Sequence, residues 1–274
     1  MKLLATDMDG TILDADNRIP KESRELILEL YQHDILTCFV TGRMWKSPAW
    51  YARQFPFPMP LISCNGGVVH DDQGEILSHR PLPMDVVAEL IDECVKSEAF
   101  FQCYNLDALY LSGYARRTLR RYATDGEDFT FLQAPVIIDR DPLPRLQATD
   151  DLPVKFVIMD TDLDKLQQIR DRIEQRPGVQ VSKSHFANLE ITAEGATKGT
   201  ALRLLVNHLR IKKEDITVIG DNENDIPMFA EAGFSIGVLG GAEQVPEAAD
   251  AVAAPPEEGG WAKAVRKYVL ERRS

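Results

Sequence analysis

The sequence predicts an α/β protein, in which helices cover both faces of a doubly wound parallel sheet and a second α/β unit is inserted into the chain. Short apolar runs that stop at a polar residue alternate with stretches in which apolar residues recur at helical spacing. This alternation is typical of parallel strands joined by helices. The middle of the 274-residue chain carries a further set of such elements. The chain is long enough to bury a core without disulfides or structural zinc.

The outer parts of the chain contain four apolar runs that we interpret as buried strands. Each ends at a polar residue: Lys2–Thr6 before Asp7, Ile35–Val40 before Thr41, Pro60–Cys64 before Asn65 and Ile216–Gly220 before Asp221. Apolar residues at helical spacing predict helices at 21–33 and 198–209. Two short runs on either side of Asp71–Gly74 predict a hairpin. These elements predict a Rossmann-like sheet.

A boundary at Arg80–Pro83 (RPLP) separates this part of the chain from the middle. There the pattern predicts helices near 85–96, 114–122 and 163–175, and strands at 100–104, 108–111, 154–159, 179–182 and 188–191. We therefore expect a core domain of residues 1–81 and 191–274 and an inserted α/β domain of residues 82–190. The segments DPLPR (141–145) and PPEEGG (255–260) are expected to be loops.

The composition excludes several classes of function. Asp plus Glu number 43 and Lys plus Arg number 31, a net charge of −12, so nucleic acid is not expected as a partner, although a small anionic substrate is compatible with a locally positive site. No apolar stretch approaches the length of a membrane span, and the run before Asp7 is too short for a signal peptide, so no membrane partner is expected. The four cysteines form no C-x-x-C pair, and we expect them to be reduced and mostly buried in a cytoplasmic protein.

The polar residues at the strand ends are the main indication of function. In an open parallel sheet, ligands bind outside the carboxyl ends of the strands, so neighbouring strands would bring Asp7, Thr41, Asn65 and Asp221 to one crevice. The run DMDGT begins at Asp7 and the run DNEND begins at Asp221, and both are rich in oxygen ligands. Such ligands suit a Mg²⁺ ion that shares a substrate phosphate, and neither run has the Gly and Glu positions of a calcium loop.

Lys198 stands at the start of a predicted helix, where a positive charge opposes the helix dipole. A phosphate bound between the lysine and the helix would reverse that effect. The surrounding sequence lacks the spacing of a P-loop, and Gly237–Gly241 lacks that of a dinucleotide-binding loop. These parts support one reaction: a carboxylate attacks phosphorus, Mg²⁺, Lys198 and Thr41 hold the phosphoryl oxygens, and a second carboxylate moves the proton.

These motifs resemble those of the haloacid dehalogenase (HAD) superfamily of phosphatases, and within it the Cof-type, subclass IIB members. The family signature stands here as Asp7–Thr11, Thr41-Gly42-Arg43, Lys198 and Gly220–Asp225. Order and spacing fit over essentially the whole chain, and the insertion follows the second motif, where subclass II caps occur. The resemblance implies a Mg²⁺-dependent phosphatase that hydrolyses small phosphorylated metabolites, such as sugar phosphates, through an aspartyl phosphate.

The resemblance also implies a role for each motif residue. Asp7 would be the nucleophile and Asp9 the acid/base. Mg²⁺ would be held by Asp7, the Asp9 carbonyl and Asp221. The phosphate would be contacted by Thr41, Gly42, Lys198 and Asn224, while Asp225 would orient Lys198. The inserted domain would be a cap, an open-faced sheet covered by helices on one side, which closes over the crevice and reads the leaving group.

Several interpretations stay open at this level. Arg43 is either a surface residue or a cation beside the phosphate. Asn65 either belongs to a turn or contacts the substrate. A basic cluster on a predicted cap helix is either a solvated face or a site for a polyanion; it consists of Arg116, Arg117, Arg120 and Arg121.

Two other functions fit the same motifs. A phosphomutase would also form an aspartyl phosphate, but would pass the phosphoryl group to a sugar hydroxyl instead of water. A non-catalytic sensor of phosphate ligands could use the same scaffold. Such a sensor could lose Asp7 or Asp9 without penalty, and the presence of both favours an enzyme.

Overall fold

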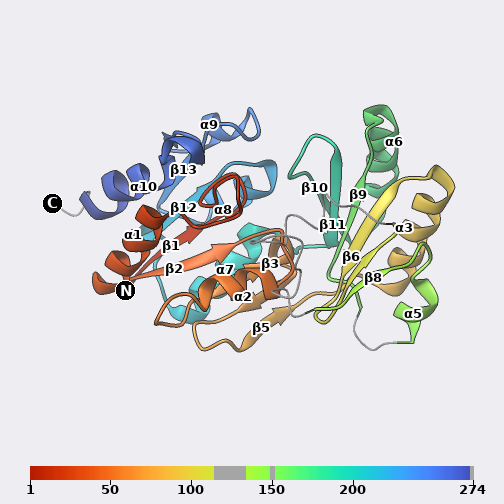
Figure 1. Cartoon of the computed structure of the whole chain (residues 1–274), viewed down its shortest axis with the longest axis horizontal. Helices are drawn as coiled ribbons and strands as arrows, with labels where there is room; N and C mark the ends of the chain where they lie inside the picture. The colour runs from red at the N-terminus through yellow and green to blue at the C-terminus, as the bar shows by residue number, and fades with distance from the viewer. Residues whose placement is uncertain (114–133, 149–151, 272–274) are drawn as a thin grey trace.

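The structure, a computed structural model, describes residues 1–113, 134–148 and 152–271. Its strands form two separate sheets, one of eight strands and one of six, which occupy the two ends of the molecule (Figure 1). The helix predicted near 114–122, and with it the arginine cluster, lies outside the described residues. Within the described part, no helix is both long and apolar enough to cross a membrane.

The eight-stranded sheet contains the strands predicted in the outer parts of the chain. Its order is β14-β13-β12-β1-β2-β3-β4-β5, parallel from β14 to β3 and antiparallel from β3 to β5. The strands are β1 Lys2–Thr6, β2 Ile35–Val40, β3 Leu61–Ser63, β4 Val68–His70, β5 Ile76–His79, β12 Ile216–Gly220, β13 Phe234–Val238 and β14 Ala251–Ala253. Ala5 of β1 pairs with Val218 on one side and Cys38 on the other, so β1 is central.

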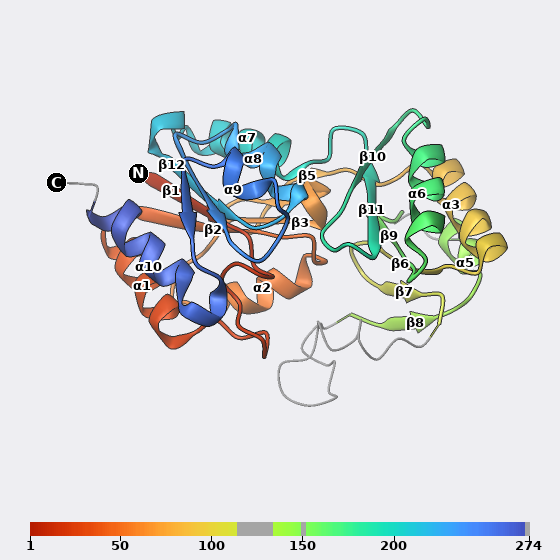
Figure 2. The ribbon, with the colours of Figure 1, turned by 90° about the horizontal axis from the view of Figure 1, so that it is seen from above.

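Helices cover both faces of this sheet, which confirms the doubly wound arrangement (Figure 2). One face carries α1 (Lys21–Gln32), α2 (Lys46–Ala52) and α10 (Gly260–Val265); the other carries α7 (Lys198–Leu209), α8 (Ile226–Phe229) and α9 (Val245–Ala248). The side chains of β1 alternate between the two layers, since Leu4 packs with α1 and α10 whereas Leu3 and Ala5 pack with α7. The sheet is therefore buried on both sides.

The six-stranded sheet has the order β10-β11-β9-β6-β7-β8 and is mostly antiparallel. Its strands are β6 Phe100–Tyr104, β7 Leu109–Leu111, β8 Val136–Ile138, β9 Lys155–Met159, β10 Val179–Ser182 and β11 Asn188–Ala193. In the described part of the chain, one of its faces is covered by α3 Met84–Ser97, α5 Leu143–Gln147 and α6 Leu163–Ile173 (Figure 2). The other face looks toward the eight-stranded sheet.

Side chains along each strand of this sheet alternate between the two faces. In β6 (FFQCY), Phe101 and Cys103 pack under the helices. Gln102 and Tyr104 belong to the opposite face, and the Tyr104 hydroxyl donates a hydrogen bond to the Gly42 carbonyl in the eight-stranded part, at 2.6 Å. The open face is thus in direct contact with the loop that follows β2.

The structure corrects two loop predictions. The segment 141–145 enters helix α5, and the segment 255–260 contains a 3₁₀ turn at Pro256–Glu258 and the start of α10. Proline is compatible with the first turn of a helix because that turn has no carbonyl partner for its N–H groups. The prolines of both segments stand at such starts, so they introduce helices here instead of excluding them.

Candidate active site

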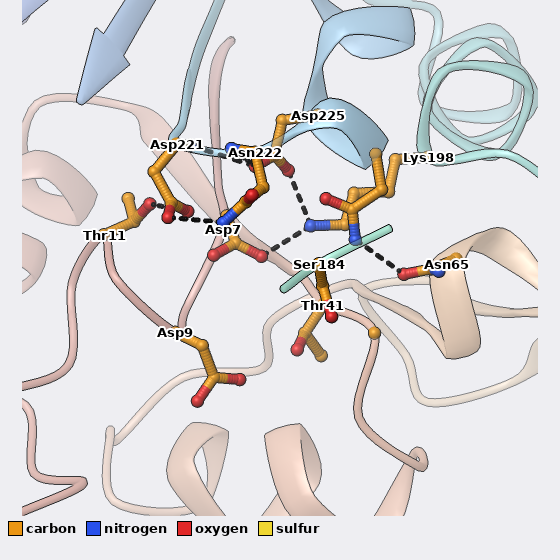
Figure 3. A network of polar contacts seen from close by, with 12 residues as sticks. Asp7, Asp9, Thr11, Thr41, Asn65, Ser184, Lys198, Asp221, Asn222 and Asp225 are labelled. Carbon is orange, nitrogen blue, oxygen red and sulfur yellow. Dashed lines mark hydrogen bonds and ion pairs between the residues drawn. The ribbon is translucent and has the colours of Figure 1, made fainter. Parts of the chain in front are cut away.

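The candidate site lies where β1, β2, β3 and β12 end. Asp7 follows β1, Thr41 follows β2, and Asp221 follows β12. Because these strands are neighbours and parallel, their carboxyl ends meet at one edge, as the sequence predicts. Figure 3 shows the side chains of these residues gathered around Lys198, which comes from the first turn of α7.

Lys198 joins two carboxylates at the centre of the site. Its Nζ lies 2.5 Å from Asp7 Oδ1 and 2.6 Å from Asp225 Oδ1, and its side chain is 1% exposed. Burial disfavours the positive charge, but the two carboxylates outweigh burial and hold the pKa of Lys198 above its ordinary value. The helix begins here because Thr197 caps it, accepting a hydrogen bond from the Thr200 N–H at 3.1 Å.

The acidic residues of the site are crowded. Carboxylate oxygens of Asp7, Asp221 and Asp225 lie within 4.8 Å of one another. Burial, together with the neighbouring carboxylates, raises the pKa of Asp7 above its ordinary value and that of Asp221 to about 7, against the opposing effect of Lys198. Accumulated negative charge of this kind favours a bound cation, and oxygen ligands suit a hard one such as Mg²⁺.

Whereas the oxygens of Asp221 accept hydrogen bonds from the side chains of Thr11 and Asn222, Asp225 is held by Lys198 and by backbone N–H groups. Oδ2 accepts hydrogen bonds from the backbone N–H groups of Asp221 and Asn222, at 3.0 and 2.9 Å, and Oδ1 accepts from Lys198. Asp7 and Asp221 are therefore the better candidates for metal ligands. The position of Asp225 suits it to orient Lys198 and the turn after β12.

Asp9 is held by Arg43 through two parallel hydrogen bonds. The guanidinium Nε lies 2.8 Å from Asp9 Oδ2, and Nη2 lies 2.5 Å from Oδ1. Arg43 is 3% exposed and also bonds Asn17 Oδ1 at 2.8 Å, so the surface interpretation of this arginine is wrong. In Figure 3 the Asp9 carboxylate points away from Asp7. Both Asp9 and Arg43 line the same pocket as Asp7.

Gly42 lines that pocket, and Thr41 precedes it at the end of β2. Thr41 is fully buried, and its hydroxyl accepts a hydrogen bond from the Arg43 N–H at 3.2 Å. The Gly42 carbonyl accepts hydrogen bonds from Lys155 Nζ at 2.9 Å and from the Tyr104 hydroxyl. A Cβ at position 42 would lie 2.7 Å from Lys155 Nζ and 2.8 Å from Asn65 Oδ1, so this close approach requires glycine.

Asn65 lies in the turn after β3, which confirms the first of its two predicted roles. It adopts a left-handed conformation (φ 56°) in the turn after β3. Its side chain also bonds two residues that line the pocket, since Nδ2 donates to Glu190 Oε2 at 2.6 Å and Oδ1 accepts from Asn224 Nδ2 at 3.1 Å. Asn65 thus links the two sheets.

The sequence motifs do not point to the residues that the six-stranded sheet and the connection between β10 and β11 contribute to the pocket. They are Gln102, Tyr104, Lys155, Ser184 and Glu190. A usable signal was present, because polar residues alternate with apolar ones in two strands of this sheet, at the end of FFQCY and along NLEITA. The pocket has an empty volume of about 480 Å³, counting the part that opens to solvent.

Comparison with known proteins matches the chain to a family of hydrolases and to relatives named as phosphatases. The family model described as haloacid dehalogenase-like hydrolase matches residues 4–265. An HMP-PP phosphatase of Serratia proteamaculans (strain 568) is 30% identical over 244 residues, which cover 88% of this chain and 84% of that protein. A 5-amino-6-(5-phospho-D-ribitylamino)uracil phosphatase of Bacillus subtilis (strain 168) is 26% identical over 277 residues, 96% of each chain.

Solved structures share the fold at lower identity. A haloacid dehalogenase-like hydrolase from B. subtilis superposes with a TM-score of 0.86 at 23% identity, covering 98% of this chain and 100% of that chain. A HAD subclass IIB sugar phosphatase superposes with a TM-score of 0.77 at 21% identity, covering 98% and 99%. At these identities the superpositions establish the fold alone.

Proposed function

The chain belongs to the haloacid dehalogenase-like hydrolase family, and from this premise we propose that it is a Mg²⁺-dependent phosphatase that hydrolyses small phosphorylated metabolites through an aspartyl phosphate on Asp7. The observation that carries the proposal is the contact of Lys198 with Asp7, beside Asp221, at the end of the central strand. The relatives named as phosphatases of HMP-PP and of a phosphoribitylamino uracil support the substrate class. The resemblance of the sequence motifs to those of Cof-type phosphatases agrees with membership of this family.

The first chemical step is assigned to Asp7. Lys198 bonds Oδ1 of this carboxylate, and we assign the attack on phosphorus to Oδ2. A bond forms between Oδ2 and phosphorus while the bond from phosphorus to the ester oxygen breaks. Thr41, the backbone at Gly42 and Lys198 lie at the same edge of the sheet and would hold the phosphoryl oxygens.

Asp9 is assigned the proton transfers. The attacking and leaving oxygens lie roughly in line, so the leaving oxygen is on the far side of phosphorus from Asp7. Asp9 lines the pocket with its carboxylate turned away from Asp7, which suits an acid that protonates that oxygen. The same carboxylate would then take a proton from the water that releases phosphate from Asp7. Arg43 fixes its orientation.

The residues present fit a divalent metal ion. Asp7, the Asp9 carbonyl and Asp221 would hold Mg²⁺. Burial, with the neighbouring carboxylates, raises the pKa of Asp7 and Asp221, and a cation would stabilise their charged forms. When bound, the ion would neutralise negative charge on the phosphoryl group.

We also propose that residues 82–190 act as a cap on a catalytic part formed by residues 1–81 and 191–274. Lys155 and Tyr104 from the six-stranded sheet meet the Gly42 carbonyl, so the open face of the cap closes the pocket and excludes water from the phosphoryl step. The four cysteines are free and buried, which supports a reducing compartment such as the cytoplasm as the place of action.

The proposal is tested with Asp7→Asn. Phosphate release is measured with Mg²⁺ on p-nitrophenyl phosphate and a panel of metabolite phosphates, and we expect at least a 10³-fold loss of kcat, on the order of the losses when a nucleophile is removed. Circular dichroism should report an unchanged fold. Asp16→Asn, an exposed residue of the same loop, is the matched control and should retain activity.

The same experiment separates the other two functions. Full turnover by Asp7→Asn would overturn the aspartyl-phosphate mechanism. A hexose phosphate that isomerises without free phosphate would indicate a phosphomutase. Binding of Mg²⁺ and phosphate esters without any hydrolysis by the wild-type protein would indicate a sensor.

A further inference from the structure

The pocket above the catalytic carboxylates has a second wall, which the motifs do not explain. It comes from the open face of the six-stranded sheet, which supplies Gln102, Tyr104, Lys155 and Glu190, and from the connection between β10 and β11, which supplies Ser184. A substrate whose phosphoryl group sits at Asp7 would place its alcohol part against this wall. The hydrogen-bonding groups that remain there therefore decide which alcohol fits.

Gln102 presents an unused acceptor at this wall. Its side chain lines the pocket and the residue is only 6% exposed. Among residues 1–113, 134–148 and 152–271, its Oε1 is buried with no hydrogen-bond donor. Buried carbonyl oxygens normally have a partner, because leaving one without a donor is costly. Since Gln102 Oε1 is an acceptor, the group that would satisfy it is a hydrogen-bond donor.

Asn224 presents a second unused acceptor from the opposite wall. It also lines the pocket, is 7% exposed, and its Oδ1 has no donor among the residues that the structure describes. Two of the five such atoms in the described part thus line one pocket, and both are carbonyl oxygens.

The orientation of the Asn224 amide is set by a relay of hydrogen bonds that starts in the cap. Glu190, as a carboxylate, only accepts hydrogen bonds, so Asn65 must turn its Nδ2 toward it. The Asn65 oxygen then faces Asn224 and takes the Asn224 Nδ2. The Asn224 oxygen is left without a donor in the described part of the chain, so the acceptor on the core side follows from the charge on Glu190.

Lys155 fixes that charge and makes the wall neutral. Its Nζ lies 2.8 Å from Glu190 Oε1, and both side chains are less than 5% exposed. Burial raises the pKa of Glu190, but Lys155 and the hydrogen bonds from Asn65 and Ser184 outweigh this and hold it below its ordinary value. Lys155 is the cation that the described part of the cap places in the pocket, and Glu190 already neutralises it.

We propose that this pocket is a leaving-group subsite that reads hydrogen-bond donors, in which the carbonyl oxygens of Gln102 and Asn224 accept from the hydroxyl or amino groups of the alcohol part of a phosphate monoester. The subsite takes an uncharged alcohol rich in such groups and disfavours one that carries a carboxylate. This inference rests on the proposed phosphatase function for its place in the reaction, and on the unused acceptors for its chemistry.

The test compares three esters with the same five-carbon chain. Ribitol 5-phosphate carries hydroxyl donors, pentyl phosphate carries none, and ribonate 5-phosphate has a carboxylate at its far end. We expect kcat/KM of the wild-type protein to be at least about tenfold higher for the ribitol ester than for the pentyl ester, since a site with unpaired polar groups discriminates against a ligand that leaves them unpaired. The ribonate ester should be the poorer of the two hydroxylated esters.

Variants then locate the acceptor. Gln102→Met should lower the ratio of kcat/KM for ribitol to pentyl ester by about tenfold, the effect of about one neutral hydrogen bond. Gln102→Glu keeps acceptor oxygens, so it should retain the preference for the ribitol ester and disfavour the ribonate ester further. Gln180→Met, the same change at an exposed position of β10, should leave the ratio unchanged.

Calorimetric binding of the same esters to Asp7→Asn, with and without Gln102→Met, gives a readout that needs no turnover. If the ribitol preference in binding depends on Gln102 while no phosphate is released by the wild-type protein, the subsite stands and the phosphatase function falls. Preference for the pentyl or ribonate ester overturns the subsite. A ratio unaffected by Gln102→Met, or lowered equally by Gln180→Met, overturns it as well.

Discussion

Arg43 holds Asp9 by both carboxylate oxygens, through Nε to Oδ2 at 2.8 Å and Nη2 to Oδ1 at 2.5 Å. The two residues follow different strands, β1 and β2, so the pair ties the ends of two neighbouring strands together. The planar guanidinium holds the carboxylate in one orientation, and both residues line the pocket. The residue assigned to proton transfer is therefore positioned by the motif that also supplies Thr41.

This pair predicts the effect of Arg43→Lys. Lysine keeps the charge but cannot form two parallel hydrogen bonds, so Asp9 loses its fixed orientation. We expect kcat for p-nitrophenyl phosphate to fall by about ten- to a hundredfold with little change in KM, because misplacement of a reacting group acts on the chemical step. Steady-state kinetics with Arg203→Lys, an exposed arginine of α7, provide the control. An unchanged kcat, or a loss confined to KM, would contradict the positioning role.

Metal binding is expected to depend on pH through Asp221, whose pKa burial raises to about 7. An unfolded Asp titrates near ~4, so between about pH 4 and 7 the folded, metal-free protein holds a proton that the unfolded chain has lost. Its stability must therefore fall as the pH rises through this window. Mg²⁺ replaces that proton, so stabilisation by Mg²⁺ should be larger at pH 8 than at pH 5.5.

Thermal unfolding with Mg²⁺ or EDTA at the two pH values measures this effect. A ligand that binds only the folded protein raises the free energy of unfolding by about 2.7 kcal/mol when its concentration is a hundred times its Kd. In Asp221→Asn the Mg²⁺-dependent shift should disappear, whereas Asp215→Asn, outside the site at the turn before β12, should keep it. Equal shifts by Mg²⁺ at pH 5.5 and pH 8 would refute the competition with protons.

Replacing one member of the buried pair of Lys155 and Glu190 should lower the free energy of unfolding far more than the charge pair itself contributes, because the remaining charge stays buried without a partner. Lys155→Met leaves Glu190 buried without its partner, and we expect a loss of about 3–5 kcal/mol in the free energy of unfolding. In the double variant with Glu190→Gln the loss should be clearly smaller than the sum of the single losses. Urea unfolding of the four proteins measures the coupling. The exposed pair of Lys96 and Asp92 on α3 is the comparison, and additive losses at the buried pair would argue against a desolvated contact.

The thiols should be inert in the folded protein. All four cysteines are free and buried, and burial raises each thiol pKa, that of Cys64 to about 12. The thiolate is the reactive form, so Ellman's reagent at pH 8 should label almost nothing in the native protein and four groups after unfolding in urea. Rapid labelling of even one thiol without denaturant would contradict this burial.

The central strands could be predicted because their sequences are buried on both faces and read as continuous apolar runs. The strands β13 and β14 were missed; Ala251–Ala253 is too short to carry a pattern of its own and is a strand only because it pairs with β13. Helix α2 was missed for a similar reason, since its seven residues include Pro48 in the first turn. Short elements depend on tertiary packing, which a local pattern does not contain.

The residues of the site likewise fall into two groups, those that the sequence predicts and those that depend on tertiary packing. Asp7, Thr41, Asn65 and Asp221 follow strand ends, so parallel pairing alone predicts that they meet, and the structure brings them together. The cap residues depend on which face of a second sheet turns toward that edge. The alternation in FFQCY predicts that Gln102 shares a face with Tyr104, but the docking of one sheet on the other decides that this face looks at the site.

The Gly42 carbonyl receives both Lys155 and Tyr104, so the groups that fasten the cap are distinct from Gln102, whose oxygen is unengaged in the described part of the chain. The side chains that bond the Gly42 loop and the side chain proposed to contact the substrate alcohol therefore lie at different positions of the same sheet. We therefore expect a replacement of Gln102 to change which phosphate ester is accepted while Lys155 and Tyr104 keep their hydrogen bonds to Gly42. Single replacements at this position would then give related enzymes different substrate specificities.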